Sequence, residues 1–540
     1  MSDAPILSVE NLSVSFGSHV AVQDLSFDIR AGETLALVGE SGSGKSATAL
    51  AVIRLIEREG GRIKQGTIRL GQDDPVDVHL LDDKQLSNVR GNRISMIFQE
   101  PMTSLNPVMR IGEQVAEVLR RHQNLSRAKA IAAAEKALDQ VRIPEPKRRL
   151  SQYPHELSGG LRQRVMIAMA LACRPEVLIA DEPTTALDVT TQAEVLALLK
   201  SLQAELGMAV LFITHDMGVV AEVANRALVL RNGVTEETAP VAQLFDAPQS
   251  DYARMLMAAT PKLGQGVIRT AVPEQEPVLS VKGLSKAFHS GGGFFSRSTH
   301  FQAVNNVCLD IRPGETLGLV GESGCGKSTL SRTLMRLIEP DQGSVVINGR
   351  DIVDMNSEEL RKQRSNIQMI FQDPYASLNP RMKVRDLITE PAYLHSGLGP
   401  TERSELAAEL LVKVTLEPEA AELFAHQFSG GQRQRLCIAR ALSVSPKVIV
   451  ADEAVSALDV STASRVTALM QQLQDELGIA FLFISHDIAI VERVSHRIAV
   501  MYKGEIVETG PTEQVLRAPQ HAYTKKLLSA VPAPVPMAAR

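Results

Sequence analysis

The sequence predicts an α/β protein built from two tandem copies of one domain. A strand-like run, a glycine-rich loop and a helical run follow one another over residues 33–56, and the same succession returns over residues 317–338. A stretch rich in Pro, Gly, Gln and Glu, residues 261–277, has no hydrophobic period and stands between the copies. Repeated order with a breaker segment between the repeats indicates a duplicated domain.

The second parts of the two copies keep a constant separation along the chain. Ser158 and Ser429 are 271 positions apart, and so are His215 and His486. Length differences fall earlier, in a longer first-copy loop at 71–83 and in a glycine-rich second-copy stretch that begins at Ser290. We therefore expect a first domain with a C-terminal extension, a linker, a second domain with its own extension and a disordered tail, at residues 1–260, 261–277, 278–530 and 531–540.

Helical patterns support the predicted domain. They follow both glycine-rich loops and recur in the middle of each copy, where a small helical insert would lie. The predicted helices are residues 47–56 and 329–338 after the loops, and 127–141 and 402–414 in the inserts.

Composition narrows the possible functions. The chain has 540 residues, 44% of them hydrophobic, which is enough for more than one core. Its net charge of -5 gives no overall attraction to nucleic acid. Four cysteines without a C-x-x-C pair favour a reducing, cytoplasmic setting. We find no secretory signal and no run of about 18 to 20 apolar residues, so we expect a soluble chain that reaches a membrane only through a partner.

The glycine-rich loops have the spacing G-x-x-x-x-G-K-S between a strand and a helix, the context that phosphate binding requires. Their backbone N–H groups and the next helix N-terminus can surround phosphate oxygens. Lys45 and Lys327 would reach the β- and γ-phosphates of ATP, while Ser46 and Ser328 would ligate Mg²⁺. The predicted ATP-binding residues are Gly39, Glu40, Ser41, Gly42, Ser43, Gly44, Lys45 and Ser46, and Gly321, Glu322, Ser323, Gly324, Cys325, Gly326, Lys327 and Ser328.

Two adjacent carboxylates end an apolar strand in each copy. These are Asp181 and Glu182 in the first copy and Asp452 and Glu453 in the second. The aspartate can hold Mg²⁺, and the glutamate can act as a general base on the attacking water. An isolated Asp-Glu pair is more often a plain acidic strand end, but its recurrence after a phosphate loop favours the catalytic interpretation.

A Ser-Gly-Gly motif precedes a long helix in each copy. Serine before glycines is a common helix N-cap, and a second anion-binding helix end is the alternative. Leu161 follows the motif in the first copy and Gln432 in the second. The motif residues are Ser158, Gly159 and Gly160, and Ser429, Gly430 and Gly431.

Together these motifs resemble the Walker A, Walker B and signature motifs of ATP-binding cassette (ABC) proteins, over nearly the whole chain. Gln99 and Gln372 match the Q-loop, a further ligand of Mg²⁺, and His215 and His486 match the catalytic switch histidine. The resemblance implies an α/β fold with two tandem P-loop NTPase domains. Each would have a RecA-like core, an antiparallel β subdomain and a helical subdomain.

The resemblance also implies an adenine contact. Phe16 and Phe288 lie where the family stacks an aromatic ring on the base. A lone Phe after an apolar strand is more often a core residue, so both interpretations stay open. The family's D-loop matches residues 186–188 and 457–459.

ABC proteins enclose two ATP molecules head to tail between two such domains. The resemblance therefore implies that the signature of each copy, with Gln432 in the second, contacts ATP bound by the other copy. Leu161 lacks the hydrogen-bonding side chain of Gln432, and Ala454 replaces the proline found at Pro183. Because both copies keep the Lys, Glu and His, we expect both sites to hydrolyse ATP.

The sequence Ser-Leu-Asn-Pro after each Q-loop resembles ATPases of the oligopeptide/dipeptide/nickel importer group. Such importers usually have two separate ATPase subunits, and this chain resembles both joined in one. A single chain with both ATPase domains resembles the microcin C/peptide importer subunit, with the glutathione importer subunit as a close rival. Some relatives hold an iron–sulfur cluster in the C-terminal extension, but residues 248–277 and 511–540 contain no cysteine.

The resemblance implies the energy-coupling subunit of a bacterial importer at the cytoplasmic face of the inner membrane. Its partners would be two permease subunits, docked near Gln99 and Gln372, and a periplasmic or lipid-anchored binding protein. A soluble tandem ABC protein acting on ribosomes or DNA, or a scaffold without turnover, are the alternatives. The short, non-helical linker and the intact glutamates argue against these two. The sequence does not identify the transported substrate.

Overall fold

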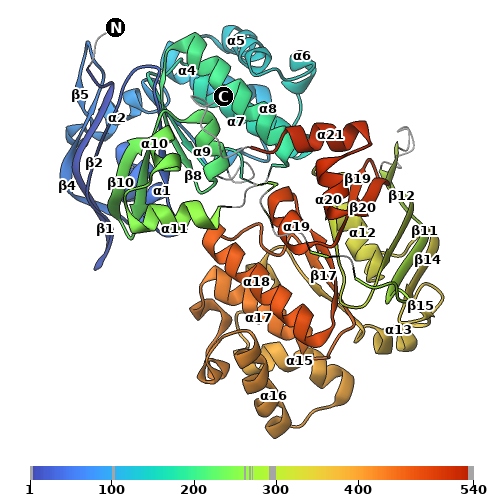
Figure 1. The fold of residues 1–540 in the computed structure, drawn as a ribbon. Coiled ribbons are helices and arrows are strands. Elements are labelled where there is room, and N and C mark those ends of the chain that lie inside the picture. The colour runs from blue at the N-terminus through green and yellow to red at the C-terminus, as the bar shows by residue number, and fades with distance from the viewer. Residues whose placement is uncertain are drawn as a thin grey trace. The chain divides into compact units, whose positions relative to one another are not determined.

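The computed structural model describes residues 4–99, 104–185, 187–260, 263–264, 266, 269–270, 272–290 and 299–532. The chain falls into two compact units, which consist mainly of residues up to Thr260 and of residues 261–531 (Figure 1). The glycine-rich insert after Ser290, Ala186 of the predicted D-loop and nearly all of the predicted disordered tail lie outside the described residues.

The first unit contains two sheets. Its four-stranded antiparallel sheet has the order β2-β1-β4-β5 and its six-stranded sheet the order β10-β9-β3-β8-β7-β6. The six-stranded sheet is parallel apart from the edge strand β10. The strands are β1 (Leu7–Phe16), β2 (His19–Ile29), β3 (Thr34–Val38), β4 (Arg62–Leu70), β5 (Val76–Asp77), β6 (Ile94–Ile97), β7 (Val177–Asp181), β8 (Ala209–Thr214), β9 (Arg226–Arg231) and β10 (Val234–Pro240).

The second unit repeats this topology. Its four-stranded sheet has the order β12-β11-β14-β15, and its six-stranded sheet the order β16-β17-β18-β13-β19-β20. The central strands of both parallel sheets are buried from end to end, as expected where helices cover both faces. The strands are β11 (Leu279–Ser290), β12 (Thr299–Ile311), β13 (Thr316–Val320), β14 (Gln342–Ile347), β15 (Arg350–Asp351), β16 (Ile367–Ile370), β17 (Val448–Asp452), β18 (Ala480–Ile484), β19 (Arg497–Tyr502) and β20 (Glu505–Pro511).

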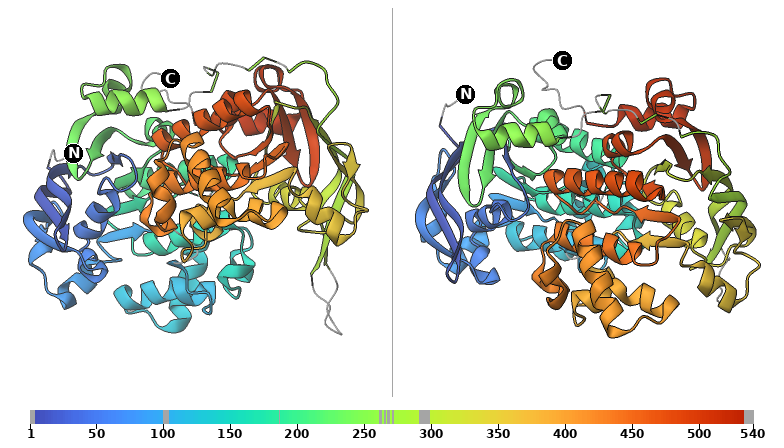
Figure 2. Two further views of the ribbon diagram at one scale, coloured as in Figure 1. Left: turned by 90° about the horizontal axis from the view of Figure 1, so that it is seen from below. Right: turned by 60° about the horizontal axis from the view of Figure 1, so that its bottom comes forward.

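Helices complete both units, and the expected helical inserts are confirmed. Arg127–Gln140 and Pro400–Lys413 form α5 and α16. In Figure 2 the insert of the first unit, in cyan, lies to one side of that unit's sheet. The helices of the first unit are α1 (Lys45–Val52), α2 (Asp83–Val89), α4 (Ile111–Gln123), α5, α6 (Pro146–Arg149), α7 (Gly159–Leu171), α8 (Val189–Leu206), α9 (Met217–Val223), α10 (Val241–Asp246) and α11 (Asp251–Ala259).

The second unit has a matching series of helices. These helices are α12 (Lys327–Leu334), α13 (Ser357–Gln363), α14 (Pro374–Ser377), α15 (Val384–Ser396), α16, α17 (Gly430–Leu442), α18 (Val460–Leu477), α19 (Ile488–Val494), α20 (Thr512–Arg517) and α21 (Ala522–Ser529). Among the described residues no helix is both long and apolar enough to cross a membrane.

The bounds expected for the helices after the glycine-rich loops were wrong at both ends. Both helices begin at the lysine of the loop and end four residues before the expected end. Arg54, with φ 54°, leaves the helical conformation and its guanidinium donates to the Leu81 carbonyl at 2.5 Å. Arg336, with φ 49°, does the same toward the Met355 carbonyl at 2.5 Å. Each helix thus ends in a left-handed turn whose backbone N–H groups bond to carbonyls of the last helical turn, and the arginine of that turn also reaches a distant carbonyl.

The described part of the linker packs on the second unit. The backbone N–H of Gly264 donates to the buried carboxylate of Glu492 at 2.9 Å. The guanidinium of Arg269 donates to Asp475 at 2.6 Å. These residues are therefore anchored by side chains of the second unit.

Candidate nucleotide sites

Each glycine-rich loop joins a strand to a helix. Its glycines have backbone conformations that other residues cannot easily adopt. Gly39 has φ 154°, and a Cβ there would lie 2.2 Å from the Leu230 carbonyl oxygen. Gly44 has φ 103° and stands as the N-cap of α1. The glycines thus let the loop turn tightly from β3 into the helix N-terminus, where backbone N–H groups attract anions.

The predicted lysines are buried within their loops. The ammonium of Lys45 donates to the carbonyls of Gly39 and Glu40, both at 2.8 Å. Lys327 makes the same two bonds in the second unit, at 2.7 and 2.9 Å. Each ammonium is therefore held inside the loop by two of the loop's own carbonyl groups.

The residue two positions before each lysine lies under its loop. The N–H of Ser43 donates to the Glu40 carbonyl at 3.2 Å, and the N–H of Cys325 donates to the Glu322 carbonyl at 3.3 Å. Both side chains are buried, and burial raises the pKa of the Cys325 thiol. These two positions shape the loop in the same way despite their different side chains.

Asp181 ends β7 beside α1. Its Oδ1 accepts a hydrogen bond from Ser46 Oγ at 3.3 Å, so two of the three predicted Mg²⁺ ligands of the first unit are brought together. Burial raises the pKa of Asp181 to about 6, although the bond from Ser46 opposes the shift.

Glu182 follows in the left-handed region, with φ 47°, at the centre of a hydrogen-bond network. Its carboxylate accepts from Gln99 Nε2 at 2.8 Å and Thr185 Oγ1 at 2.9 Å, and its Oε1 lies 3.0 Å from His215 Nδ1. Burial opposes ionisation, but His215 and Thr185 outweigh it and lower the pKa of Glu182 to about 2. The pKa of His215 is raised by Glu182 against the effect of burial. The structure thus unites a general-base candidate with the predicted Q-loop and switch residues.

The second unit assembles the same network with fewer contacts. Gln372 Nε2 donates to Glu453 at 2.6 Å, whereas His486 Nδ1 lies 3.7 Å from that carboxylate. The hydroxyl of Ser456 turns away to the backbone carbonyl of Glu453, at 2.9 Å. Burial raises the pKa of Glu453, but His486 outweighs it and the net shift is downward.

Asp452 also differs from its counterpart. It accepts from Ser331 Oγ at 3.0 Å, and Ser331 was not among the predicted site residues. The other carboxylate oxygen, Oδ1, is buried and has no hydrogen-bond partner within the part of the chain that the structure describes. Sequence reasoning missed Ser331 and Thr185 because neither falls inside a motif. Their position one turn after a motif residue was the available signal.

Both signature serines are helix N-caps. Ser158 Oγ accepts the N–H of Leu161 at 3.4 Å, and Ser429 Oγ accepts the N–H of Gln432 at 3.4 Å. Gln432 also accepts the N–H of Ser429 through Oε1 at 3.0 Å, which closes a capping box. Leu161 cannot form that bond. The helices begin at Gly159 and Gly430, immediately after the caps.

The two glycines of each signature have different surroundings. A Cβ on Gly160 would lie 2.6 Å from Thr191 Cγ2, and a Cβ on Gly431 would lie 2.2 Å from Thr462 Cγ2. A Cβ on Gly159 would meet nothing within 4 Å. A Cβ on Gly430 would be in ordinary contact with Leu458 Cδ2, at 3.8 Å. The second glycine is therefore required by packing inside its own unit, whereas a Cβ at the first would fit without a clash.

The two phenylalanines predicted to stack on adenine differ in exposure. Phe16 is half-buried at the edge of the core of its unit. Phe288 is 41% exposed, with the Lys286 ammonium 5.9 Å from its ring centroid. Adenine stacking stays a prediction for both.

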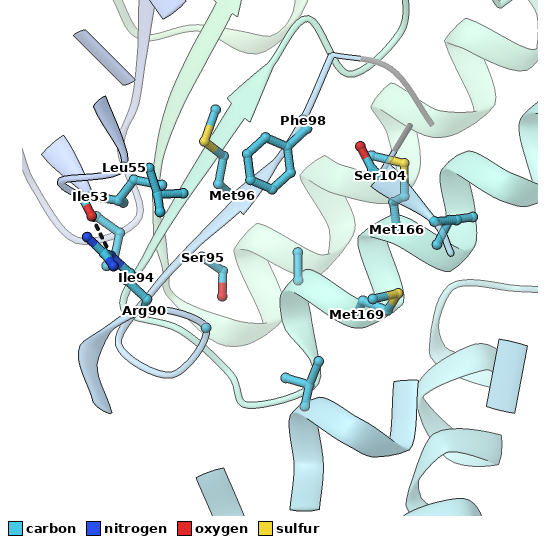
Figure 3. A pocket seen from close by; sticks show the side chains of 14 residues that line it. Ile53, Leu55, Arg90, Ile94, Ser95, Met96, Phe98, Ser104, Met166 and Met169 are labelled. Carbon is cyan, nitrogen blue, oxygen red and sulfur yellow. Dashed lines mark hydrogen bonds between the residues drawn. The ribbon is translucent and has the colours of Figure 1, made fainter. Parts of the chain in front are cut away.

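An apolar cavity of about 300 Å³ adjoins the Q-loop of the first unit (Figure 3). Phe98, the residue before Gln99, is 40% exposed and lines it together with Met96. Met166 and Met169 of α7 line it from the helical insert. The motifs did not point to this cavity, because its methionines have no fixed spacing.

Comparison with known proteins identifies the family. A model of the ABC transporter family matches residues 22–185 and 304–456, and a model of the oligopeptide/dipeptide transporter C-terminal region matches 237–301 and 507–540. The glutathione import ATP-binding protein GsiA of Escherichia coli O157:H7 is 52% identical over an alignment covering 98% of this chain and 90% of the relative. GsiA of Salmonella typhimurium (strain LT2) is 53% identical, with coverages of 98% and 89%. The dimeric structure of the ATP-binding cassette MJ0796 bound to ADP and Pi is 31% identical over 43% of this chain and 98% of that chain, with a TM-score of 0.39.

The chain belongs to the ABC transporter family, and its two domains are ABC ATPase domains. Within that family it is the ATPase subunit of an importer of the oligopeptide/dipeptide group. The predicted fold class and reaction are thereby confirmed.

Proposed function

We propose that both units bind ATP at their glycine-rich loops and hydrolyse it with Glu182 and Glu453 as general bases. The observation that carries the proposal is the repeated network in which one glutamate lies beside a glutamine and a histidine from distant parts of the chain. An ionised carboxylate can accept a proton from water while the histidine and glutamine orient it. The low pKa of Glu182 keeps it in that form.

The residues near each loop also fit Mg²⁺, a hard cation that takes oxygen ligands. Ser46 and Asp181 already lie together, and Asp452 has a buried carboxylate oxygen without a partner among the described residues. Ser328, Gln99 and Gln372 would complete the two ligand sets. The metal ion would neutralise charge on the β- and γ-phosphates.

Each ATP-binding site would be completed by the signature motif of the other unit. Ser158 and Ser429 start helices whose N-termini carry partial positive charge, and Gly159 presents an open face beside that end. ATP bound between the halves would favour a closed state, and hydrolysis of ATP would allow the halves to separate.

The cavity beside Phe98 supports docking of a permease. An exposed aromatic ring beside half-buried methionines forms an adaptable surface for an amphipathic helix, and this surface is adjacent to the catalytic network through Gln99. Two permease subunits would hold the ATPase at the cytoplasmic face of the bacterial inner membrane. A periplasmic or lipid-anchored binding protein would deliver the cargo.

We infer a peptide cargo, and the names of the relatives favour glutathione, itself a small peptide. Microcin C-like peptides, dipeptides and nickel chelates are the other cargoes of the group. Measuring uptake of each by membranes containing the assembled complex distinguishes them.

The test of the mechanism is a set of three variants, Glu182→Gln, Glu453→Gln and the double variant. Glutamine keeps the size of the side chain but cannot accept the proton. Each single change should lower kcat for ATP in the assembled complex, and the double change should lower it by about 100-fold or more, the size of a general-base contribution. Binding of ATP should persist, as measured by equilibrium dialysis.

Full turnover in either single variant would contradict equal participation of the two sites. No turnover in the unaltered complex would instead revive a nucleotide-gated scaffold.

A further inference from the structure

We propose that Tyr252 and Tyr523 are positioning residues through which each C-terminal extension holds the ATP-binding loop of its own unit. The inference rests on the proposed assignment of these loops to ATP. It gives the extensions, whose role the motifs leave undefined, a direct effect on nucleotide affinity.

In the first unit the contact runs from the extension to the second residue of the loop. The backbone N–H of Glu40 donates to the hydroxyl oxygen of Tyr252 at 3.2 Å. Tyr252 is 2% exposed and lies in the first turn of α11, beside β10 (Figure 1). The guanidinium of Arg231 covers its ring at 4.8 Å from the centroid. The hydroxyl is therefore delivered from a buried, supported ring.

The second unit reproduces the contact independently. The N–H of Glu322 donates to the hydroxyl oxygen of Tyr523 at 2.9 Å. Tyr523 is buried in α21, and Tyr502 stacks on its ring with centroids 4.2 Å apart. Arg231 and Tyr502 occupy matching positions, 271 apart, as do the two tyrosines themselves. Both halves thus keep the bond to the loop although the support of the ring differs.

A carboxylate from the last sheet strand fixes where each tyrosine helix begins. Glu237 of β10 accepts the N–H groups of Gln249 at 3.0 Å and Ser250 at 2.8 Å. Glu508 of β20 accepts those of Gln520 at 2.8 Å and His521 at 3.0 Å. Tyr252 and Tyr523 each lie two residues beyond the second of these amides. The tyrosine is thereby tied to the sheet that also carries the loop.

The bond to tyrosine and the bond to lysine hold opposite sides of one loop residue. The N–H of Glu40 is held by Tyr252, and its carbonyl is held by Lys45 at 2.8 Å. Glu322 is held in the same way by Tyr523 and Lys327. Fixing both groups limits rotation of the loop backbone before ATP binds. A preorganised loop loses less entropy on binding, so the tyrosine should act on affinity.

The experiment isolates one loop at a time in the full-length chain. Lys327→Ala leaves the first loop as the measured site, and Lys45→Ala leaves the second. Tyr252→Phe is then made in the first background and Tyr523→Phe in the second, which removes one oxygen and keeps the ring. Binding of radiolabelled ATP and turnover with Mg²⁺ are measured.

Each tyrosine variant should raise the dissociation constant for ATP about three- to tenfold, the effect of one neutral hydrogen bond. KM for ATP should rise with it, while kcat at saturating ATP changes little. Tyr502→Phe in the Lys45→Ala background is the matched control, because it removes a neighbouring hydroxyl without touching the loop. The crossed variant, Tyr523→Phe with Lys327→Ala, should leave the first loop unaffected.

An unchanged dissociation constant in both tyrosine variants would overturn the inference, and so would an equal change in the crossed variant. If the Lys45→Ala, Lys327→Ala double variant still bound ATP as tightly as the parent, the proposed function itself would fail. The two failures are therefore distinguishable.

Discussion

Single residues in this protein show which parts of a motif serve the fold and which face outward. The two signature glycines are adjacent, but only Gly160 is in close contact with its own unit, at Thr191. Gly159 and Gly160 are the same residue type, so the sequence does not distinguish them. Their separate roles appear only once α7 and α8 are packed together.

A pair of alanine variants tests this difference. Gly160→Ala should lower the free energy of unfolding by about 1–3 kcal/mol, because a Cβ cannot fit against Thr191 Cγ2. Gly159→Ala should leave stability unchanged but reduce ATP turnover on the order of tenfold, since it adds a methyl group to the proposed ATP-facing surface. Calorimetry and ATPase assays measure the two effects.

Thr191→Ser provides the control, because it removes only the clashing methyl group. Combined with Gly160→Ala it should restore most of the lost stability. Failure of that rescue would contradict the steric explanation.

Sequence spacing located motif residues that the structure brings together, Gln99 and His215 beside Glu182 among them, for a physical reason. Phosphate loops, acidic strand ends and helix caps depend on backbone geometry that few residue types allow, so their spacing is informative. Partners such as Ser331 and Thr185 were missed, because their position one turn after a motif residue is a weak signal and any hydroxyl at the right place in three dimensions can make their bonds.

At the scale of elements, the halves hold the start of one core strand by different means. In the first unit the N–H of Thr34 donates to Asn225 Oδ1 at 2.8 Å. In the second the N–H of Thr316 donates to His496 Nδ1 at 3.0 Å. Burial and the charge of Arg269 lower the pKa of His496 to about 4. The ring must therefore stay neutral to accept this bond.

The second unit should lose stability in acid because of this histidine. Its pKa in the folded state lies below the ordinary value near 6.5, so the unfolded chain takes up the proton first as pH falls. The contribution of neutral His496 to the free energy of unfolding is complete above about pH 6.5 and declines toward pH 4, with a loss of about 2 kcal/mol at pH 5.

His496→Asn copies the first unit and should remove that part of the acid sensitivity, as calorimetric unfolding at pH 7.5 and pH 5 would show. The same pH dependence in the variant and the parent would contradict the assignment.

Helix ends were the weakest part of the sequence-based fold. Apolar spacing located the helices after the glycine-rich loops, but both end in left-handed turns at Arg54 and Arg336. Arginine is not a residue type that usually marks such a turn, so nothing in the sequence indicated it. The inserted helices α5 and α16 were predicted to within two residues at each end.

At the scale of the whole molecule, fusion keeps the two ATPase units at a high effective concentration. Chains 1–260 and 261–540 produced separately should therefore hydrolyse ATP with a specific activity that falls on dilution. The fused chain should show no such fall. The second chain begins at Pro261 so that Gly264 and Arg269 keep their anchors.

Undiminished activity of the separate chains at nanomolar concentration would show that the halves do not need each other. Mixing each chain with a partner that carries Glu182→Gln or Glu453→Gln then reports how much of the turnover depends on each glutamate.

The ring supports at Arg231 and Tyr502 carry a consequence for exchanging parts between the halves. One extension meets a cation and the other an aromatic ring at the same place in the fold. A chimera that moved α21 into the first half without Tyr502 would exchange the aromatic neighbour of its tyrosine for the guanidinium of Arg231. A module that keeps each tyrosine with its own ring support therefore runs from β9 or β19 to the end of its extension.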